Sequence, residues 1–331
     1  SVMRGRLDAR RTLKSLVADL RMGTFGSDKK LTPYLDSLYQ QSLSFSHFYS
    51  SGIHTNHGIY STLYSFPAIM KRNAMKGSVI PVYSGLPTVL QENGYCNLFF
   101  MTHESQYDNM NAFLRTNGFD EIYAQENYPS EKVVNSFGVQ DDFMYQYALP
   151  ILNERAGTGN PFFSVLLSIS NHPPYVIPPY FHPHSDVLEE QIVEYADWSI
   201  RQFMQAAEKQ PWFDNTIFVF LGDHGKMVGT PECEMPQSYN HIPLMIYGKD
   251  IKPGVYDGFG GQVDVSPTLL GLLNISYLQN NFGVNLLEEE RPCMFFTADN
   301  LIGARDSVNM FILKSATKLF SVLLASKRPL I

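Results

Sequence analysis

Residues 216–226 read TIFVFLGDHGK, and this stretch indicates both a fold and a site. Its apolar first half is typical of a buried strand in a parallel sheet. Asp223 and His224 follow directly, and Gly222 and Gly225 allow the backbone to turn closely around them. A carboxylate next to an imidazole is suited to holding one divalent metal ion. The alternative interpretation is that the Asp-His pair caps the next helix, because Asp is a good N-cap residue.

Strand and helix patterns alternate on both sides of this stretch. Short apolar runs followed by helical patterns are the signature of βαβ units and a mostly parallel sheet, so we expect an α/β fold. Residues 125–160 and the tail after about residue 290 show no clear pattern. The expected strands are 43–50, 95–101, 162–169, 216–222 and 242–248, and the expected helices are 31–42, 58–66, 84–94, 107–118, 187–210 and 264–275.

Polar side chains gather at the ends of these expected strands. In an open parallel sheet, ligands bind beyond the carboxyl ends of the strands, so these side chains are candidates for one site. A single histidine in a loop needs no functional explanation, but a set at successive strand ends does. Six of the nine histidines lie in or beside such loops: His54, His57, His103, His172, His224 and His241.

Thr55 stands out in SSGIHTNHGIYSTLYSFP, residues 50–67. It falls between an expected strand and an expected helix, where backbone N–H groups and the helix dipole favour an anion. A threonine hydroxyl is a poor nucleophile at neutral pH, and a bound metal is one of the few ways to ionise it. Thr55 beside Asp223 and His224 therefore predicts a covalent phosphoryl-transfer centre. The alternative is a plain N-cap, and we expect His54 and His57 to lie beside the site without binding the metal.

Composition narrows the classes of protein that fit. The chain of 331 residues is 44% hydrophobic and 17% charged, which suits a folded protein with a large core. A net charge of -7 gives no electrostatic footprint for nucleic acid. The cysteines, Cys96, Cys233 and Cys293, have no metal-ligand spacing. No apolar run approaches the length of a membrane span, and the start, SVMRGRLDARR, has no apolar core of a signal peptide.

Several motifs occur together in an order that resembles a known family. These are FYSSGIHTNHGIYSTLYSFP, SNHPPY, FLGDHGK, YNHIPLMIYG and VDVSPTLLGLL, spread over roughly residues 22–310. As a set they are similar to the alkaline phosphatase/sulfatase superfamily, and within it to the lipoteichoic acid synthase-like phosphoglycerol transferases. The resemblance implies an α/β/α sandwich with a mostly parallel central sheet, formed by residues 1–331 as a single catalytic domain with an atypical stretch at 1–21.

The resemblance also implies roles for particular residues. Thr55 would be both the nucleophile and a metal ligand, beside the ligands Asp223 and His224. His172 in SNHPPY would contact the transferred headgroup, and His103 is expected to bind substrate as well. His241 falls in an H-x-P element that in some relatives reaches the substrate or a second zinc ion. The cofactor would be one divalent ion (manganese, magnesium or zinc), with a second zinc as an option.

The implied reaction moves a phosphoglycerol-type headgroup from a lipid donor to a glycan or lipid acceptor, through a covalent Thr55 intermediate. The implied location is outside the cytoplasmic membrane, with an anchor in segments that this chain does not include. A phosphoethanolamine transferase and a phosphodiesterase share the residues named above. A formylglycine sulfatase does not fit, because threonine cannot be converted to formylglycine.

One departure concerns the first strand of the family, which usually ends in a Glu-Ser step whose glutamate completes the metal site. The matching segment is RRTLKSLVADLRMGTFG, residues 10–26, where Lys14 precedes Ser15. An ammonium group at that position would repel a metal ion, so a metal-poor, non-catalytic domain is the second alternative. Asp19 is the other carboxylate of the segment that could serve as the ligand.

Overall fold

The computed structural model describes residues 11–16, 22–77, 79–226, 233–314 and 318–323. The central feature is an eight-stranded sheet with the order β10-β2-β9-β8-β1-β7-β3-β4. Its strands are β1 (Arg11–Leu16), β2 (Leu43–Tyr49), β3 (Cys96–Met101), β4 (Glu121–Tyr123), β7 (Phe162–Leu167), β8 (Ile217–Leu221), β9 (Leu244–Tyr247) and β10 (Gly254–Gly261). The α/β fold and each of the five expected strands are thus confirmed.

All neighbouring strands of this sheet pair in parallel, except that β9 runs antiparallel to both β2 and β8. The carboxyl ends of the parallel strands therefore share one edge of the sheet with the amino end of β9. This edge is where the polar residues found in the sequence are expected to meet.

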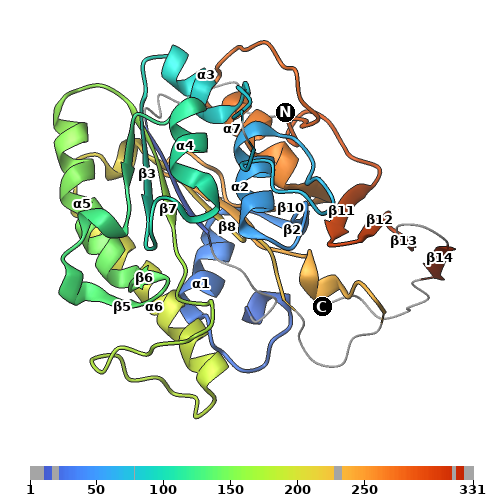
Figure 1. The fold of residues 1–331 in the computed structure, drawn as a ribbon, viewed down its shortest axis with the longest axis horizontal. Helices are drawn as coiled ribbons and strands as arrows, with labels where there is room; N and C mark the ends of the chain where they lie inside the picture. The colour runs from blue at the N-terminus through green and yellow to red at the C-terminus, as the bar shows by residue number, and fades with distance from the viewer. Residues whose placement is uncertain (1–10, 17–21, 78, 227–232, 315–317, 324–331) are drawn as a thin grey trace.

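Helices cover both faces of the sheet and make it the middle layer of an α/β/α sandwich (Figure 1). One face is covered by α2 (Thr55–Tyr64), α3 (Leu86–Glu92), α4 (Met110–Thr116) and α7 (Val265–Leu272). The other is covered by α1 (Pro33–Gln41), α5 (Asp141–Gly157) and α6 (Leu188–Ala207). The six expected helices correspond to α1, α2, α3, α4, α6 and α7, while α5 lies in the region that showed no clear pattern.

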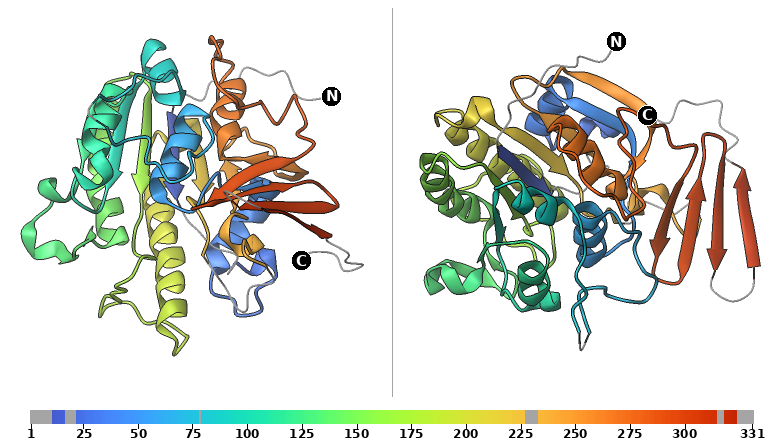
Figure 2. Two further views of the ribbon diagram at one scale, coloured as in Figure 1. Left: turned by 45° about the vertical axis from the view of Figure 1, so that its right-hand side comes forward. Right: turned by 90° about the horizontal axis from the view of Figure 1, so that it is seen from above.

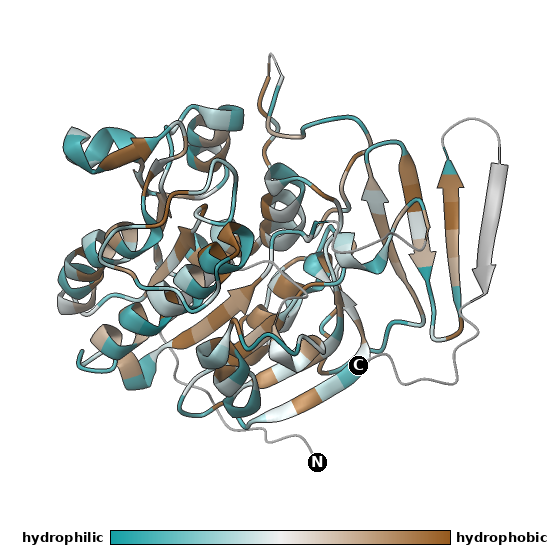
Figure 3. Cartoon of the chain, turned by 90° about the horizontal axis from the view of Figure 1, so that it is seen from below, coloured by the Kyte–Doolittle hydropathy of each residue, from teal (hydrophilic) through white to brown (hydrophobic). Residues whose placement is uncertain are grey.

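The two faces are built by alternation along the strands. On β8, Val219 and Leu221 pack with the α2 side, whereas Phe218 and Phe220 pack with the α1 side. Successive side chains of a strand point to opposite faces, so a strand buried on both sides reads as an unbroken apolar run. The hydropathy colouring of Figure 3 shows these apolar strands enclosed by helices with hydrophilic outer surfaces.

A second, antiparallel sheet stands beside the sandwich (Figure 2). Its strands are β11 (Met294–Ala298), β12 (Leu301–Arg305), β13 (Asn309–Lys314) and β14 (Lys318–Leu323). One of its faces packs around Tyr49 and Met235. A two-stranded ribbon, β5 (Val133–Asn135) with β6 (Gly138–Val139), leads directly into α5.

Candidate functional site

The loops that follow β7 and β8, together with residues of α1, α2, α5 and α6, line a cleft at the functional edge of the sheet. The cleft holds about 840 Å³ of empty space, its open mouth included. Four of the predicted site residues, Thr55, His172, Asp223 and His224, lie in its wall. The remaining lining residues are Met22, Thr32, Leu35, Asp141, Ser168, Ile169, Asn171, Val193, Ala196, Gly225 and Lys226.

Thr55 is the first residue of α2 and points its hydroxyl at the loop after β8. The Thr55 hydroxyl donates a hydrogen bond to Asp223 Oδ2 over 2.9 Å. The N-cap of α2 is His54, and its side chain makes no capping hydrogen bond. Thr55 is therefore not the N-cap residue of α2, which was the alternative interpretation of the sequence. Its hydroxyl is committed to the carboxylate, which is the arrangement a metal-activated nucleophile needs.

Asp223 and His224 present their remaining donor atoms side by side. The His224 backbone N–H donates to Asp223 Oδ1 over 2.8 Å, which fixes the carboxylate. His224 Nδ1 lies 2.8 Å from the Gly225 carbonyl oxygen, so Nδ1 is the atom that donates to the backbone and Nε2 is the atom left for a ligand. Nε2 is 3.5 Å from Asp223 Oδ2. A backbone carbonyl that sets the tautomer in this way is a common support of metal-bound histidines.

These three residues fit a divalent metal ion. Thr55 Oγ1, Asp223 Oδ2 and His224 Nε2 supply a hydroxyl, a carboxylate and an imidazole from two adjoining segments. Within the described residues, no cluster of three or more His, Cys, Asp and Glu side chains has metal-binding geometry. These residues therefore supply only two of the usual charged or imidazole ligands, together with the threonine hydroxyl.

Two packing features hold the site together, and neither was predicted from the sequence. Gln262 is buried and donates from Nε2 to the Asp223 carbonyl oxygen over 2.6 Å, while its Oε1 accepts from the Ser51 N–H at 2.9 Å. It therefore ties the loop after β8 to the loop before α2. Gly58 lies so close that a Cβ there would be 3.0 Å from the Asp223 carbonyl oxygen. No motif identified Gln262, because it precedes α7 and acts across the fold.

Gly225 is needed for a close backbone approach, as the sequence predicted. A Cβ at Gly225 would lie 1.9 Å from the Ser238 carbonyl oxygen. The Gly225 N–H donates to the Tyr239 carbonyl oxygen over 2.9 Å. The segment that follows β8 is thus fastened to the segment that precedes β9.

His172 lies at the mouth of the cleft on the loop after β7. Its Nδ1 is 2.7 Å from the Pro173 carbonyl oxygen, which leaves Nε2 as the atom available to a ligand. The imidazole ring packs on Phe137 at 4.2 Å between centroids. This position, in the wall of the cleft but not among the donors around Asp223, suits a substrate contact better than a metal ligand.

Lys226 brings a positive charge into the same cleft. Its Nζ donates to the Tyr175 hydroxyl over 2.8 Å and lies 5.3 Å from the centre of that ring. An ammonium group in the cleft wall favours an anionic substrate. Lys226 is part of the motif FLGDHGK, but no role was predicted for it.

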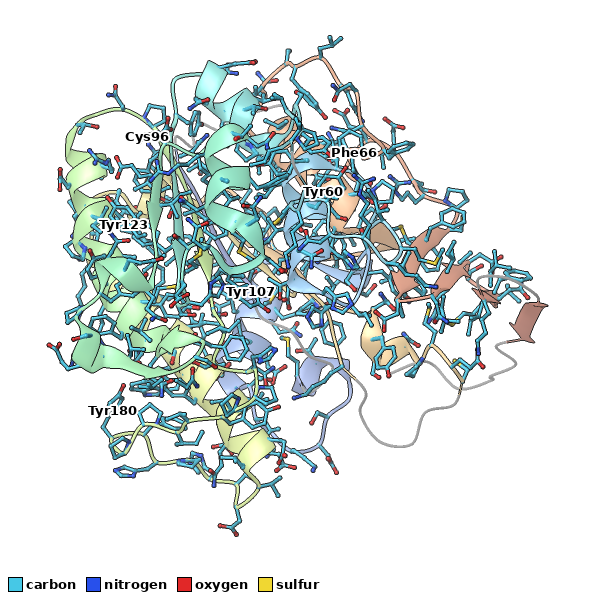
Figure 4. All side chains as sticks on the ribbon, in the orientation of Figure 1. Tyr60, Phe66, Cys96, Tyr107, Tyr123 and Tyr180 are labelled. Atoms are coloured by element: carbon cyan, nitrogen blue, oxygen red, sulfur yellow. The ribbon has the colours of Figure 1, made fainter. Side chains whose placement is uncertain are left out.

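His103 and His241 are not in the described wall of this cleft. His103 is buried beneath Tyr107, with 4.9 Å between ring centroids, and its Nδ1 lies 2.9 Å from the Glu104 carbonyl oxygen (Tyr107 is labelled in Figure 4). His241 is buried between Phe25 and Tyr49, and its Nε2–H donates to the Ser46 carbonyl oxygen over 2.8 Å. The structure therefore gives both histidines core positions, in contrast to the substrate-binding roles expected for them.

His54 and His57 lie beside the site, as expected. His54 is exposed and pairs with Asp299 at 2.9 Å. His57 is buried, and its burial, together with the neighbouring His54, lowers the pKa of His57 to about 4. The two imidazole rings are 5.1 Å apart. Neither lines the described part of the cleft.

The register of β1 tests whether Lys14 occupies the position of the family's metal-binding glutamate. β1 is a central strand between β7 and β8, as the family resemblance implied, even though its sequence is charged. Lys14 pairs with Val219, four residues before Asp223. At a rise of roughly 3.3 Å per residue, this puts the Lys14 backbone about 13 Å short of the level of Asp223. The register thus argues against Lys14 at the metal position, and Asp19 lies outside the described residues.

Comparison with known proteins identifies the family. The sulfatase family model matches residues 12–275, which is most of the chain. The chain belongs to the sulfatase family. Members of this family are enzymes, either transferases or hydrolases, and the superfamily uses divalent metal ions. Among curated proteins, the chain is similar to two from Bacillus subtilis.

The lipoteichoic acid synthase-like protein YvgJ is 25% identical over 297 residues, covering 80% of this chain and 47% of that protein. Lipoteichoic acid synthase 2 is 22% identical over 332 residues, covering 89% of this chain and 48% of that protein. This chain thus spans about half the length of the curated relatives it matches.

Solved structures of the superfamily confirm the fold. An alkaline phosphatase superfamily protein from Vibrio parahaemolyticus is 28% identical, with a TM-score of 0.86 over 94% of this chain and 78% of that chain. The lipoteichoic acid synthase LtaP from Listeria monocytogenes is 22% identical, with a TM-score of 0.81 over 93% of this chain and 83% of that chain. The α/β/α sandwich expected from the sequence is therefore a sulfatase-family fold.

Proposed function

We propose that this chain is a metal-dependent phosphoryl-group transferase that moves a phosphoglycerol-type headgroup from a lipid donor through a covalent Thr55 intermediate. The observation that carries the proposal is the hydrogen bond from Thr55 Oγ1 to Asp223 Oδ2, with His224 Nε2 beside it. The lipoteichoic acid synthases among its relatives supply the headgroup class.

The proposed transfer takes place in two steps. The Thr55 hydroxyl loses its proton to water and its Oγ attacks the donor phosphorus, the bond from phosphorus to the diacylglycerol oxygen breaks, and that oxygen takes up a proton. An acceptor hydroxyl then attacks the phosphoryl-Thr55, its proton is lost, and Thr55 Oγ leaves and is reprotonated. A divalent ion held by Thr55, Asp223 and His224 would lower the pKa of the Thr55 hydroxyl and offset charge on the phosphoryl oxygens.

The cleft supplies further groups for this chemistry. His172 lines the cleft and its Nδ1 contacts the Pro173 carbonyl oxygen, so in this proposal Nε2 donates a proton to the leaving oxygen or contacts the headgroup. Lys226 offers an ammonium group to the phosphate of the donor. Its hydrogen bond to Tyr175 fixes the direction of the ammonium group.

With a lipid donor the reaction would take place at a membrane surface, and the similarity to lipoteichoic acid synthases supports a location outside the cytoplasm. No helix in the described ranges is long and apolar enough to cross a membrane.

The test is to trap the intermediate. The metal-loaded protein is mixed with phosphatidylglycerol vesicles, quenched in acid and digested, and the peptide containing Thr55 is examined by mass spectrometry. The proposal predicts a phosphoglycerol adduct on Thr55, and none in Thr55→Ala. If the adduct is hydrolysed to free glycerol phosphate in the absence of an acceptor, the protein is a phosphodiesterase. An adduct formed only from phosphatidylethanolamine would identify a phosphoethanolamine transferase, and no adduct from any donor would contradict the covalent route.

A further inference from the structure

The loop that carries His172 is contacted along one side by the segment that leads into α5. We define the His172 loop as residues 168–176 and the clamp segment as residues 135–141. The His172 loop follows β7 and supplies Ser168, Ile169, Asn171 and His172 to the cleft wall. Since it is a loop at a strand end, its geometry depends on what packs against it.

We infer that Asp141 is a positioning residue that fixes the His172 loop, and with it His172, for the transfer reaction. Asp141 Oδ1 accepts hydrogen bonds from two consecutive backbone N–H groups, that of Ile169 at 2.9 Å and that of Ser170 at 3.2 Å. These groups lie just beyond the end of β7. The role of His172 belongs to the proposed function, so the inference rests on that function.

The hydrogen bonds from Ile169 and Ser170 are important for stability because Asp141 is buried. Its side chain is 1% exposed, and burial raises the pKa of Asp141 to about 6, partly offset by the two N–H donors. A buried carboxylate is costly unless hydrogen bonds compensate for the lost water. The loop backbone supplies this compensation, so carboxylate and loop stabilise each other in one geometry.

The neighbouring Asp142 does not share this task. Its carboxylate accepts from the Tyr180 hydroxyl at 2.8 Å and from the Tyr195 hydroxyl (Tyr180 is labelled in Figure 4). The two adjacent carboxylates at the start of α5 thus have different partners. Asp142 binds two tyrosine hydroxyls, and Asp141 binds the backbone of the His172 loop. Only Asp141 of the pair lines the described cleft.

Other contacts of the clamp segment reinforce the same loop. Phe137 packs against the His172 ring, Gln140 Nε2 donates to the Val176 carbonyl oxygen at 3.0 Å, and Asn135 Nδ2 donates to the Pro174 carbonyl oxygen at 3.1 Å. The clamp segment is itself anchored, because a Cβ at Gly138 would lie 1.7 Å from the Thr102 carbonyl oxygen at the end of β3. The loop is therefore held along most of its length.

The chain offers a matched control in Asp197. This residue is also a buried aspartate that accepts from two consecutive backbone N–H groups, those of Tyr34 at 3.1 Å and Leu35 at 2.8 Å. Burial likewise raises the pKa of Asp197 to about 6. Its side chain is not in the described cleft wall. Asp197→Asn thus removes the same kind of charge from a different backbone segment.

The first test is amide hydrogen exchange, which needs no substrate. In the unaltered protein the amides of Ile169 and Ser170 should exchange slowly, like those of β7. Asp141→Asn should speed exchange in residues 168–172 by roughly 10- to 100-fold, since hydrogen bonds to a charged acceptor are being weakened. Asp197→Asn should leave this loop unchanged. Fast exchange at Ile169 and Ser170 in the unaltered protein would overturn the inference even if the variant failed to fold, and so would equal effects of the two variants.

The second test separates positioning from direct catalysis, with bis(4-nitrophenyl) phosphate as the probe. Asp141→Asn should lower kcat/KM about tenfold in the unaltered background and cause no further loss in a His172→Ala background. Asp197→Asn should leave kcat/KM unchanged. Additive losses would show that Asp141 acts on the substrate itself and not through His172. If the unaltered protein turned over no phosphodiester, the proposed function would fail while the exchange experiment would still decide whether Asp141 holds the loop.

Discussion

The Thr55 hydroxyl donates to the Asp223 carboxylate over 2.9 Å, although 168 residues separate the two in the chain. One belongs to the start of α2 and the other to the end of β8, and the sheet order brings these ends to one edge. This contact joins the predicted nucleophile to the predicted metal ligand, so most of the chemistry proposed for the chain depends on it.

We expect Thr55→Ala to lower phosphodiester turnover by at least ~10³-fold while the protein stays folded. The variant loses one hydrogen bond, which costs about 1 kcal/mol of unfolding free energy, but it also loses the covalent route. Steady-state kinetics with thermal unfolding in parallel check this. Thr55→Ser is the matched control and should retain part of the activity, because it keeps the hydroxyl. Normal turnover by folded Thr55→Ala would rule out the covalent mechanism.

Metal content should depend on Asp223 and His224. Plasma emission analysis after loading with manganese, magnesium or zinc should show less bound metal in Asp223→Ala and His224→Ala than in the unaltered protein. Because β1 pairs Lys14 with Val219 and not with the level of Asp223, Lys14→Glu should leave the metal content unchanged. A gain of metal in Lys14→Glu would instead place residue 14 at the site, as the family resemblance implied.

For His172→Ala we predict a loss of turnover of about 100-fold at unchanged metal content. A positioned proton donor contributes roughly 10²–10⁴ in rate, and His172 stands apart from the Asp223 carboxylate. His184 is a suitable control, because its side chain is 97% exposed and lies outside the described cleft wall. His184→Ala should behave like the unaltered protein. Loss of metal in His172→Ala would make His172 a ligand and show that its assignment here is wrong.

Acid should destabilise the fold through His241. Burial lowers the pKa of His241 to about 4, and among the described residues its Nδ1 has no hydrogen-bond partner that could accept a proton. In the unfolded chain the pKa returns to about 6.5, so the unfolded state binds more protons as the pH falls below that value. The stabilising contribution is complete above pH 6.5 and is lost progressively down to about pH 4.

The expected loss from His241 between pH 7 and pH 5 is on the order of 2 kcal/mol of unfolding free energy. His241→Gln keeps a donor for the Ser46 carbonyl oxygen but cannot titrate, so its urea-unfolding free energy should fall less over this range. His184→Gln should show the full loss. Equal slopes in His241→Gln and the unaltered protein would show that His241 is not the group responsible.

The helices and strands with regular apolar patterns were predictable from the sequence. The elements that were not predicted lack such a pattern for physical reasons. α5 contains Pro150 and has no clean apolar stripe, so no helical pattern is visible in residues 141–157. β10 is an edge strand with four glycines and little apolar character. The antiparallel direction of β9 follows from pairing on both sides, which a single strand's sequence cannot show.

The site was predictable where residues follow strands directly. Asp223, His224 and Thr55 were found because strand ends of a parallel sheet converge at one edge. His103 and His241 follow or precede strands too, but their rings turn into the core against Tyr107 and Tyr49. Gln262 and Asp141 were missed because each acts on the backbone of a distant segment, and no local pattern records such a contact.

The close contact at Gly225 has a consequence for how this protein could acquire new specificity. The chain leaves Asp223 and His224 at Gly225 and returns to the same point at Ser238 and Tyr239. The entropy cost of closing a loop grows slowly, by about 0.6 kcal/mol for each doubling of its length. The length of the segment between these two points can therefore change at little cost in conformational entropy, while the Gly225–Tyr239 hydrogen bond still fastens the backbone next to Asp223 and His224. Lys226, its first residue, already lines the cleft, so a new segment inserted there would meet the substrate directly.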